Sequence, residues 1–84
     1  SDVDKVSGVI ITDWYNISSD QKIKINLFVK SNVISPESID VKIFEEQFID
    51  NVWMQVDRNS DLENKIKDSI INTAVNIQLA SENL

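Results

Sequence analysis

Glu45 and Glu46 are adjacent carboxylates, and hydrolases use carboxyl groups in pairs for acid and base catalysis. Adjacent residues of a strand point to opposite faces of a sheet, so these two cannot share one site. Asp57, Asp61 and Asp68 lack the spacing and the glycine of a calcium loop. We interpret all of these carboxylates as solvated surface charge.

The nucleophiles of the chain lack the residues that would activate them. The sequence contains no histidine and no cysteine, which removes the commonest general base, the thiol nucleophile and the usual zinc ligands. Its serines have no glycine-rich elbow, and a single glycine, Gly8, is too few for a phosphate-binding loop. The sequence therefore predicts a domain that is not an enzyme and that binds no cofactor or metal.

Length and charge set further bounds. The chain has 84 residues, which is enough for one small domain, and it contains no apolar run long enough to span a bilayer. Fourteen acidic and eight basic residues give a net charge of −6, which disfavours nonspecific binding to nucleic acid or to an anionic membrane. We expect residues 1–7 to be a flexible lead-in and residues 8–84 to form one domain.

Four segments predict strands. Val9–Tyr15 is rich in β-branched and aromatic residues and is followed by turn-forming residues 16–20. Apolar and polar residues alternate over 22–30, 39–48 and 52–56, with a break at Asp50-Asn51. Short connections between these strands favour an antiparallel meander.

A long helix follows over residues 60–81. Ser60 and Glu63 have the spacing of a capping box, which marks its start. An apolar stripe at intervals of three and four follows, widened by Thr73 and Ala80; it consists of Leu62, Ile66, Ile70, Ala74 and Ile77. A sheet face is needed to cover so long a stripe. We therefore predict an α+β fold, with a four-stranded antiparallel sheet and one long C-terminal helix packed on one face.

The strand alternation assigns residues to the two sheet faces. The face toward the helix is predicted to consist of Ile23, Ile25, Leu27, Val41, Ile43, Val52, Met54 and Val56. The opposite face should carry a candidate partner-binding surface formed by Trp14, Lys24, Phe28, Lys42, Phe44 and Trp53. Two alternatives stay open for Phe28 and Phe44, which either face solvent or wrap into the core. Trp14 joins this face only if its register agrees.

Lysines beside aromatic rings also occur on sheets that bind nucleic acid, where bases stack on the rings. Here only one strand is basic and the domain as a whole is acidic, so we expect no nucleic-acid partner.

Several segments of the chain resemble an uncharacterised family of alphaproteobacterial lipoproteins, a domain of unknown function with a Thr-Asp-Trp-Tyr motif. They are Gly8–Tyr15 (GVIITDWY), Lys24–Phe28 (KINLF), Val41–Phe44 (VKIF), the lone Trp53 and Asp68–Ala74 (DSIINTA). More distantly, the pattern of strands and helix is similar to the helix-grip domains of BamC-type lipoproteins, which accompany the outer-membrane barrel assembly machine.

The resemblance implies an exported protein with a signal peptide and a lipid-anchored cysteine upstream of Ser1, facing the periplasm at the outer membrane or cell envelope. It also implies contact with the membrane only through that anchor. We expect a non-catalytic binding or scaffold module that engages another envelope protein through the outer sheet face or an open sheet edge. The alternative is a carrier that holds a lipid or glycan between sheet and helix. Solid packing of the helical stripe against the sheet would disfavour the carrier.

Overall fold

A computed structural model of the chain describes residues 8–83. In this range the chain forms five strands, one short 3-10 helix and one α-helix. In chain order they are β1 (Gly8–Ile11), β2 (Tyr15–Ser18), β3 (Gln21–Val29), the 3-10 helix (Pro36–Ser38), β4 (Ile39–Ile49), β5 (Val52–Val56) and α1 (Ser60–Glu82). The expected lead-in, residues 1–7, lies outside the described residues.

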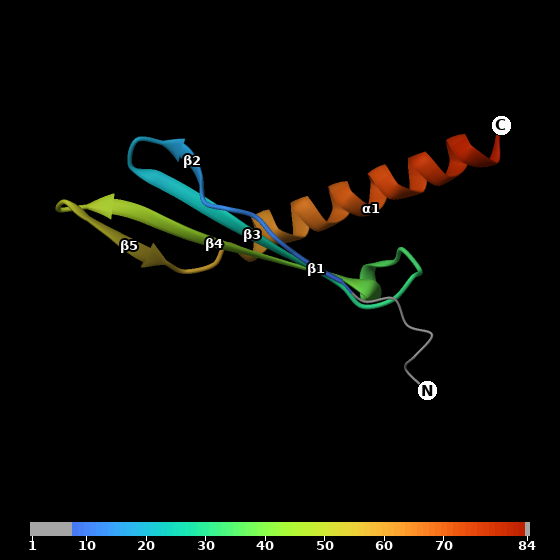
Figure 1. Ribbon diagram of the computed structural model, residues 1–84, viewed down its shortest axis with the longest axis horizontal. Coiled ribbons are helices and arrows are strands. Elements are labelled where there is room, and N and C mark those ends of the chain that lie inside the picture. Colours follow the sequence, from blue (N-terminus) through green and yellow to red (C-terminus); the bar gives the residue numbers. More distant parts are fainter. Residues whose placement is uncertain (1–7, 84) are drawn as a thin grey trace.

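The strands form one antiparallel sheet in the order β1-β3-β4-β5, and β2 also pairs with β3 (Figure 1). The predicted α+β class and the antiparallel meander are therefore confirmed. The single strand predicted over residues 9–15 is wrong, because it is divided into two. β1 lies against residues 26–29 of β3, and β2 lies against residues 21–23.

A bulge divides these two strands. Three residues, Thr12 to Trp14, separate the last pair of β1 from the first pair of β2, but only two residues of β3 lie opposite them. At the break, the amide of Thr12 donates to the carbonyl of Ile25, and the amide of Ile25 donates to Oγ1 of Thr12. The threonine side chain thus replaces the backbone acceptor that the bulge removes.

Tight turns connect the other strands. The predicted break at Asp50-Asn51 is confirmed: both residues have positive φ, 52° and 65°, as the two central positions of a type I′ hairpin turn require. Asp and Asn tolerate this conformation better than most residues. The turn before β3 is shorter than predicted, because Asn16 and Ile17 already belong to β2.

The core lies between α1 and the middle of the sheet. Ile39, Val41 and Ile43 of β4 are buried, and Ile39 is only 1% exposed. The partly buried residues that pack against them are Ile23, Ile25, Leu27, Leu62, Ile66, Ile70 and Ile71. The alternation of β3 and β4 and the first half of the helical stripe were predicted correctly. Ile39, the most buried core residue, was not among the residues predicted for the core.

Three residues predicted to be in the core are exposed instead, namely Val52, Met54 and Ile77, at 59%, 50% and 63%. The cause is an offset between the two layers. α1 starts beside the middle of β4 and runs past the end of the sheet at which β4 begins (Figure 1). The hairpin of β4 and β5 is therefore left uncovered at one end, and the second half of α1 projects at the other.

This offset makes the molecule elongated. Its radius of gyration is 16.1 Å, whereas a compact domain of this length has about 12 Å. No helix among residues 8–83 is long and apolar enough to cross a membrane. The layers are therefore extended along one direction and leave large apolar side chains at the surface of both ends.

The start of α1 differs from the predicted capping box. Asn59 is the N-cap, and its side chain accepts a hydrogen bond from the amide of Leu62 at 3.1 Å. Because Asn59 takes this position, Ser60 becomes the first residue of the helix. Glu63 is then free to turn toward β4, where its buried carboxylate pairs with the half-exposed Arg58.

Candidate functional site

The sheet face that points away from α1 carries all six predicted partner-binding residues, and we call this surface the lysine–aromatic face. Strand register places Lys24 opposite Phe44, Phe28 opposite Asp40, and Trp53 opposite Phe48. Their side chains alternate with those that pack under α1. Phe28 and Phe44 are half-buried on this outer face, so neither wraps into the core.

Trp14 reaches this face because of the bulge. The extra residue between β1 and β2 turns Tyr15 toward the α1 side, where it lies opposite Ile23, and leaves Trp14 on the other side. Its ring lies 5.2 Å from Nζ of Lys22 and 5.1 Å from Nζ of Lys24. Trp14 is thereby added to the rings contributed by β3, β4 and β5.

Lys22, near one end of β3, joins two rings of this surface, although it was not among the predicted site residues. Its ammonium group is 4.2 Å from the ring centroid of Trp53 and also contacts Trp14, so two tryptophans from distant segments share one cation. Oε1 of Glu46 lies 3.3 Å from the same nitrogen. Alternation places Lys22 on this face, but only the sheet order brings both tryptophans within its reach.

The charges of the face divide into paired and unpaired groups. Lys22 is paired with Glu46, and Lys30 with Asp40 at 2.7 Å. The hydrogen bond from Lys30 lowers the pKa of the Asp40 carboxyl. Lys24 and Lys42 have no carboxylate within 4.0 Å among residues 8–83; they contact the rings of Trp14 and Phe28 instead. On this face, Lys24 and Lys42 thus differ from Lys22 and Lys30, which are held by carboxylates of the described range.

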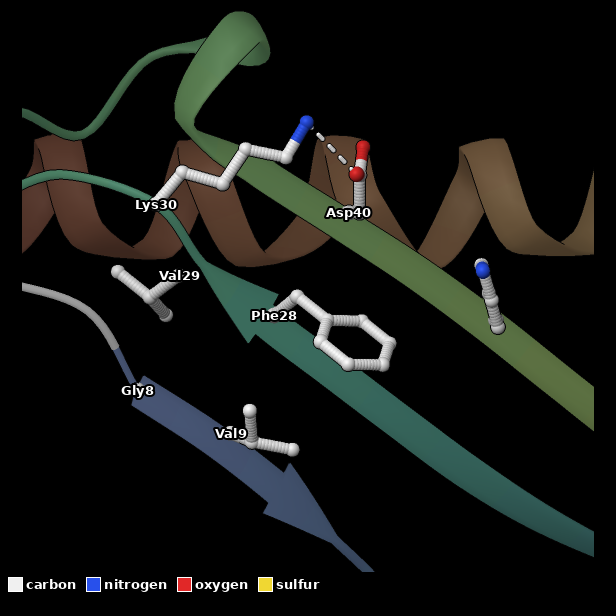
Figure 2. A pocket seen from close by; sticks show the side chains of 7 residues that line it. Gly8, Val9, Phe28, Val29, Lys30 and Asp40 are labelled. Atoms are coloured by element: carbon white, nitrogen blue, oxygen red, sulfur yellow. Dashed lines mark ion pairs between the residues drawn. The ribbon is translucent and has the colours of Figure 1, made fainter.

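Two open depressions mark the surface. One of about 300 Å³ contains Trp14, Lys24 and Phe44 in its lining. The other, of about 680 Å³, lies at the other end of the face; Figure 2 shows the Phe28 ring in it beside Val9 and the ion pair of Lys30 and Asp40. Both depressions therefore combine an aromatic ring with an ammonium group that has no carboxylate partner within the described range, Lys24 in one and Lys42 in the other.

Asn26 lies in the smaller depression between Ile11 and Lys42 on the neighbouring strands. Its Oδ1 is buried and accepts no hydrogen bond from the described residues. A buried acceptor without a partner costs about 1–3 kcal/mol. An unpartnered buried polar atom calls for an explanation such as an ordered water or a ligand, so we add Asn26 to the candidate site.

The remaining carboxylates have structural roles or lie on separate faces. Glu45 lies on the α1 side, where its Oε2 accepts hydrogen bonds from Gln21 and Gln47, while Glu46 lies on the lysine–aromatic face. The prediction that these two do not share a site is confirmed. Within the described range, no cluster of three or more acidic side chains has a geometry that could hold a metal ion.

Glu63 is a buried carboxylate, 5% exposed, that accepts a hydrogen bond from the edge of β4. β5 pairs with β4 only as far as Glu45, so the amide of Ile43 has no strand partner. That amide donates to Oε2 of Glu63 at 2.8 Å, and Arg58 holds both carboxylate oxygens at 2.7 and 3.0 Å. The hydrogen bond from Arg58 lowers the pKa of Glu63, and the amide of Ile43 adds to this effect. This group joins helix to sheet and does not belong to a site.

Comparisons with known proteins find an uncharacterised family, as the sequence resemblance predicted. The profile of a domain of unknown function, DUF3576, matches residues 1–79. A relative, the uncharacterized protein RP420 of Rickettsia prowazekii (strain Madrid E), is 42% identical over 81 residues, which cover 94% of this chain and 48% of the relative. The chain thus spans about half the length of that relative. No solved structure matches it.

Proposed function

Because the chain belongs to the DUF3576 family of domains of unknown function, we propose a function from its surface chemistry: a non-catalytic module that binds another protein. The lysine–aromatic face is the binding surface in this proposal. The observation that carries it is the placement of Trp14, Phe28, Phe44 and Trp53 on one uncovered sheet face, with the ammonium groups of Lys24 and Lys42 unpaired among residues 8–83.

The chemistry of the face supports one kind of partner. Aromatic rings bury a large apolar area, and lysines beside them favour carboxylates. The partner is therefore a protein segment that presents acidic groups next to apolar side chains. An extended segment could in addition pair with the outer edge of β1 and β2, which no other described strand covers.

We place this module in the cell envelope, as part of a lipoprotein that acts in outer-membrane or envelope assembly. Support for this location comes from the resemblance of the Thr12–Tyr15 motif and its companion segments to alphaproteobacterial lipoproteins. The similarity to BamC-type helix-grip domains favours a scaffold or adaptor role by analogy of fold alone.

The alternative, a carrier of lipid or glycan, needs a cavity between helix and sheet. Leu62, Ile66 and Ile70 instead pack directly on the buried residues of β4. The open depressions described above are lined by strand and loop residues. The packing therefore gives the carrier little support, and the binding module is the better proposal.

Site-specific photo-crosslinking in cells that produce the natural full-length protein tests this function. A photoreactive residue replaces Phe44 on the lysine–aromatic face or, as the matched control, exposed Lys65 on α1. We expect adducts with an envelope protein from position 44, few from position 65, and loss of the adducts when Lys24 and Lys42 are both changed to Glu. A cytoplasmic protein, or equal adducts from both positions, would falsify the proposal.

A further inference from the structure

The α1 side of the molecule has two uncovered apolar surfaces, one at each end. The first, which we call the distal patch, is the sheet surface beyond the start of α1, formed by Tyr15, Ile49, Val52 and Met54. The second is the projecting half of α1, residues 72–82, with Val75, Ile77 and Leu79 exposed. Both surfaces result from the same offset between helix and sheet (Figure 1).

The two surfaces match in length. The strand segment 44–49, which extends beyond the start of α1, is about 20 Å long at 3.3 Å per residue. Helix residues 72–82 span about 16 Å at 1.5 Å per residue. The projecting half of one helix can therefore cover the uncovered part of one sheet.

The surfaces also match in charge. From Ser69 to Ser81 the helix contains no charged residue, in a chain of which 26% is charged. None of the four side chains of the distal patch is charged; Asp50, in the turn between Ile49 and Val52, borders the patch, and Glu45 on the same sheet face is held by two glutamine amides. Two copies of a chain with net charge −6 repel one another, and uncharged surfaces are where they can approach most closely.

The helix changes its apolar side where it leaves the sheet. Leu62, Ile66 and Ile70 form the stripe that packs on β4. Val75 and Leu79 each follow a residue of this stripe, Ile66 and Ile70, by nine positions, which at about 100° per residue places them about 180° away around the helix axis. Val75 and Leu79 therefore point away from the direction of the chain's own sheet, as contact with another sheet requires.

We propose that the chain forms a two-fold symmetric homodimer in which the projecting half of each α1 covers the distal patch of the other copy. The two helices then lie in one layer between two sheets, and each helix contacts its own sheet first and the partner's sheet second. A depression of about 390 Å³ beside Tyr15, also lined by Ile23 and Ile25, lies next to the distal patch and can receive apolar side chains of the helix. Because each contact occurs twice, the assembly is closed.

Sedimentation equilibrium of the 84-residue chain tests the proposal, with the expected mass twice that of one chain. Leu79→Glu and Met54→Lys should each give monomers with unchanged far-ultraviolet circular dichroism, because both positions are about half exposed. The controls are Lys65→Glu, on the exposed side of the half of α1 that covers the chain's own sheet, and Gln55→Lys on the opposite face of the same strand as Met54; both should remain dimeric.

Mixing the two monomeric variants gives the sharpest result. In a mixed dimer, the carboxylate introduced at position 79 of one copy meets the ammonium group introduced at position 54 of the other. In the other helix–sheet contact of the mixed dimer, the unchanged Leu79 of one copy meets the unchanged Met54 of the other. We therefore expect the mixture to dimerise. A natural chain that stays monomeric would overturn the proposal and indicate that another protein segment covers these surfaces. A dimer sensitive to Leu79→Glu but not to Met54→Lys would also overturn it, since the helices would then pair with each other.

Discussion

The two faces of the sheet are built by the same strands but stabilised in different ways. Toward α1, aliphatic side chains of β3 and β4 meet the helix, and Ile39 and Ile43 are 1% and 3% exposed. On the other face, no second layer covers the strands in the described structure. There the ammonium groups of Lys22 and Lys24 lie over the ring of Trp14, and that of Lys22 also lies over the ring of Trp53.

This difference shows how a single strand can serve two purposes. Every second residue of the strand points toward α1 and contributes to stability through burial. The residues between them point to the other face and remain half-exposed and available for contact. Substitutions at neighbouring positions of one strand should therefore have very different effects on the free energy of unfolding.

The largest effect is expected on the α1 side. Ile39→Ala should lower the free energy of unfolding by about 2–5 kcal/mol, because it leaves a cavity among residues that cannot fully collapse. Urea denaturation followed by circular dichroism measures the change. If this variant does not fold, Ile39→Val should still fold and lose about 0.5–1.5 kcal/mol. A loss near zero for both variants would show that the face toward α1 is not the stabilising one.

Glu63→Ala should have the next largest effect, about 1–3 kcal/mol, because the buried amide of Ile43 loses its acceptor. The free energies of unfolding of the natural chain and of Glu63→Ala can also be compared as a function of pH. The pKa of Glu63 is lowered below its ordinary value of 4.5, so its stabilising contribution is complete above that value and is lost as the pH falls through the folded-state pKa. The difference in unfolding free energy between natural chain and variant should be constant near neutral pH and shrink in acid. A difference independent of pH would contradict the role of the charged carboxylate.

Lys22→Met tests the lysine–aromatic face. It keeps most of the apolar stem but removes the cation shared by Trp14 and Trp53, and we expect a loss of about 1 kcal/mol and a shifted tryptophan emission. Lys65→Met, on the exposed side of α1, is the matched control and should change neither quantity. Unchanged emission in Lys22→Met would mean that the two rings are not organised by this lysine.

The smallest effect has the opposite sign. Asn26→Val removes a buried acceptor that has no partner among the described residues and introduces a residue favoured in strands, so stability should rise by about 0.5–1 kcal/mol. If Asn26 belongs to the binding surface, the same variant should lose crosslinks from position 44. A more stable variant with unchanged crosslinks would limit the binding surface to the rings and lysines.

Much of the local structure follows from the sequence. The alternation of residues 22–30 and 39–48 assigns side chains to faces because successive residues of a strand point in opposite directions. The turn at Asp50-Asn51 follows from residue types that accept positive φ, and the helix follows from its apolar spacing. These features depend on contacts between residues close in the chain, and so a pattern of a few residues is enough to predict them.

The tertiary structure alone decided the rest. Whether Ile77 or Met54 is buried depends on how far the helix is displaced along the sheet, and no local pattern encodes that distance. Asn59, and not Ser60, caps α1, while Glu63 accepts a hydrogen bond from an amide of β4, twenty residues earlier in the chain, a partner that no pattern at the start of the helix predicts.

The cluster of Trp14, Lys22 and Trp53 likewise needs the bulge and the strand order. The sequence by itself determined which residues lie on each face, because that follows from backbone geometry. Only the packing of helix on sheet determined which of them are covered, because burial depends on the positions of segments that are distant in the chain.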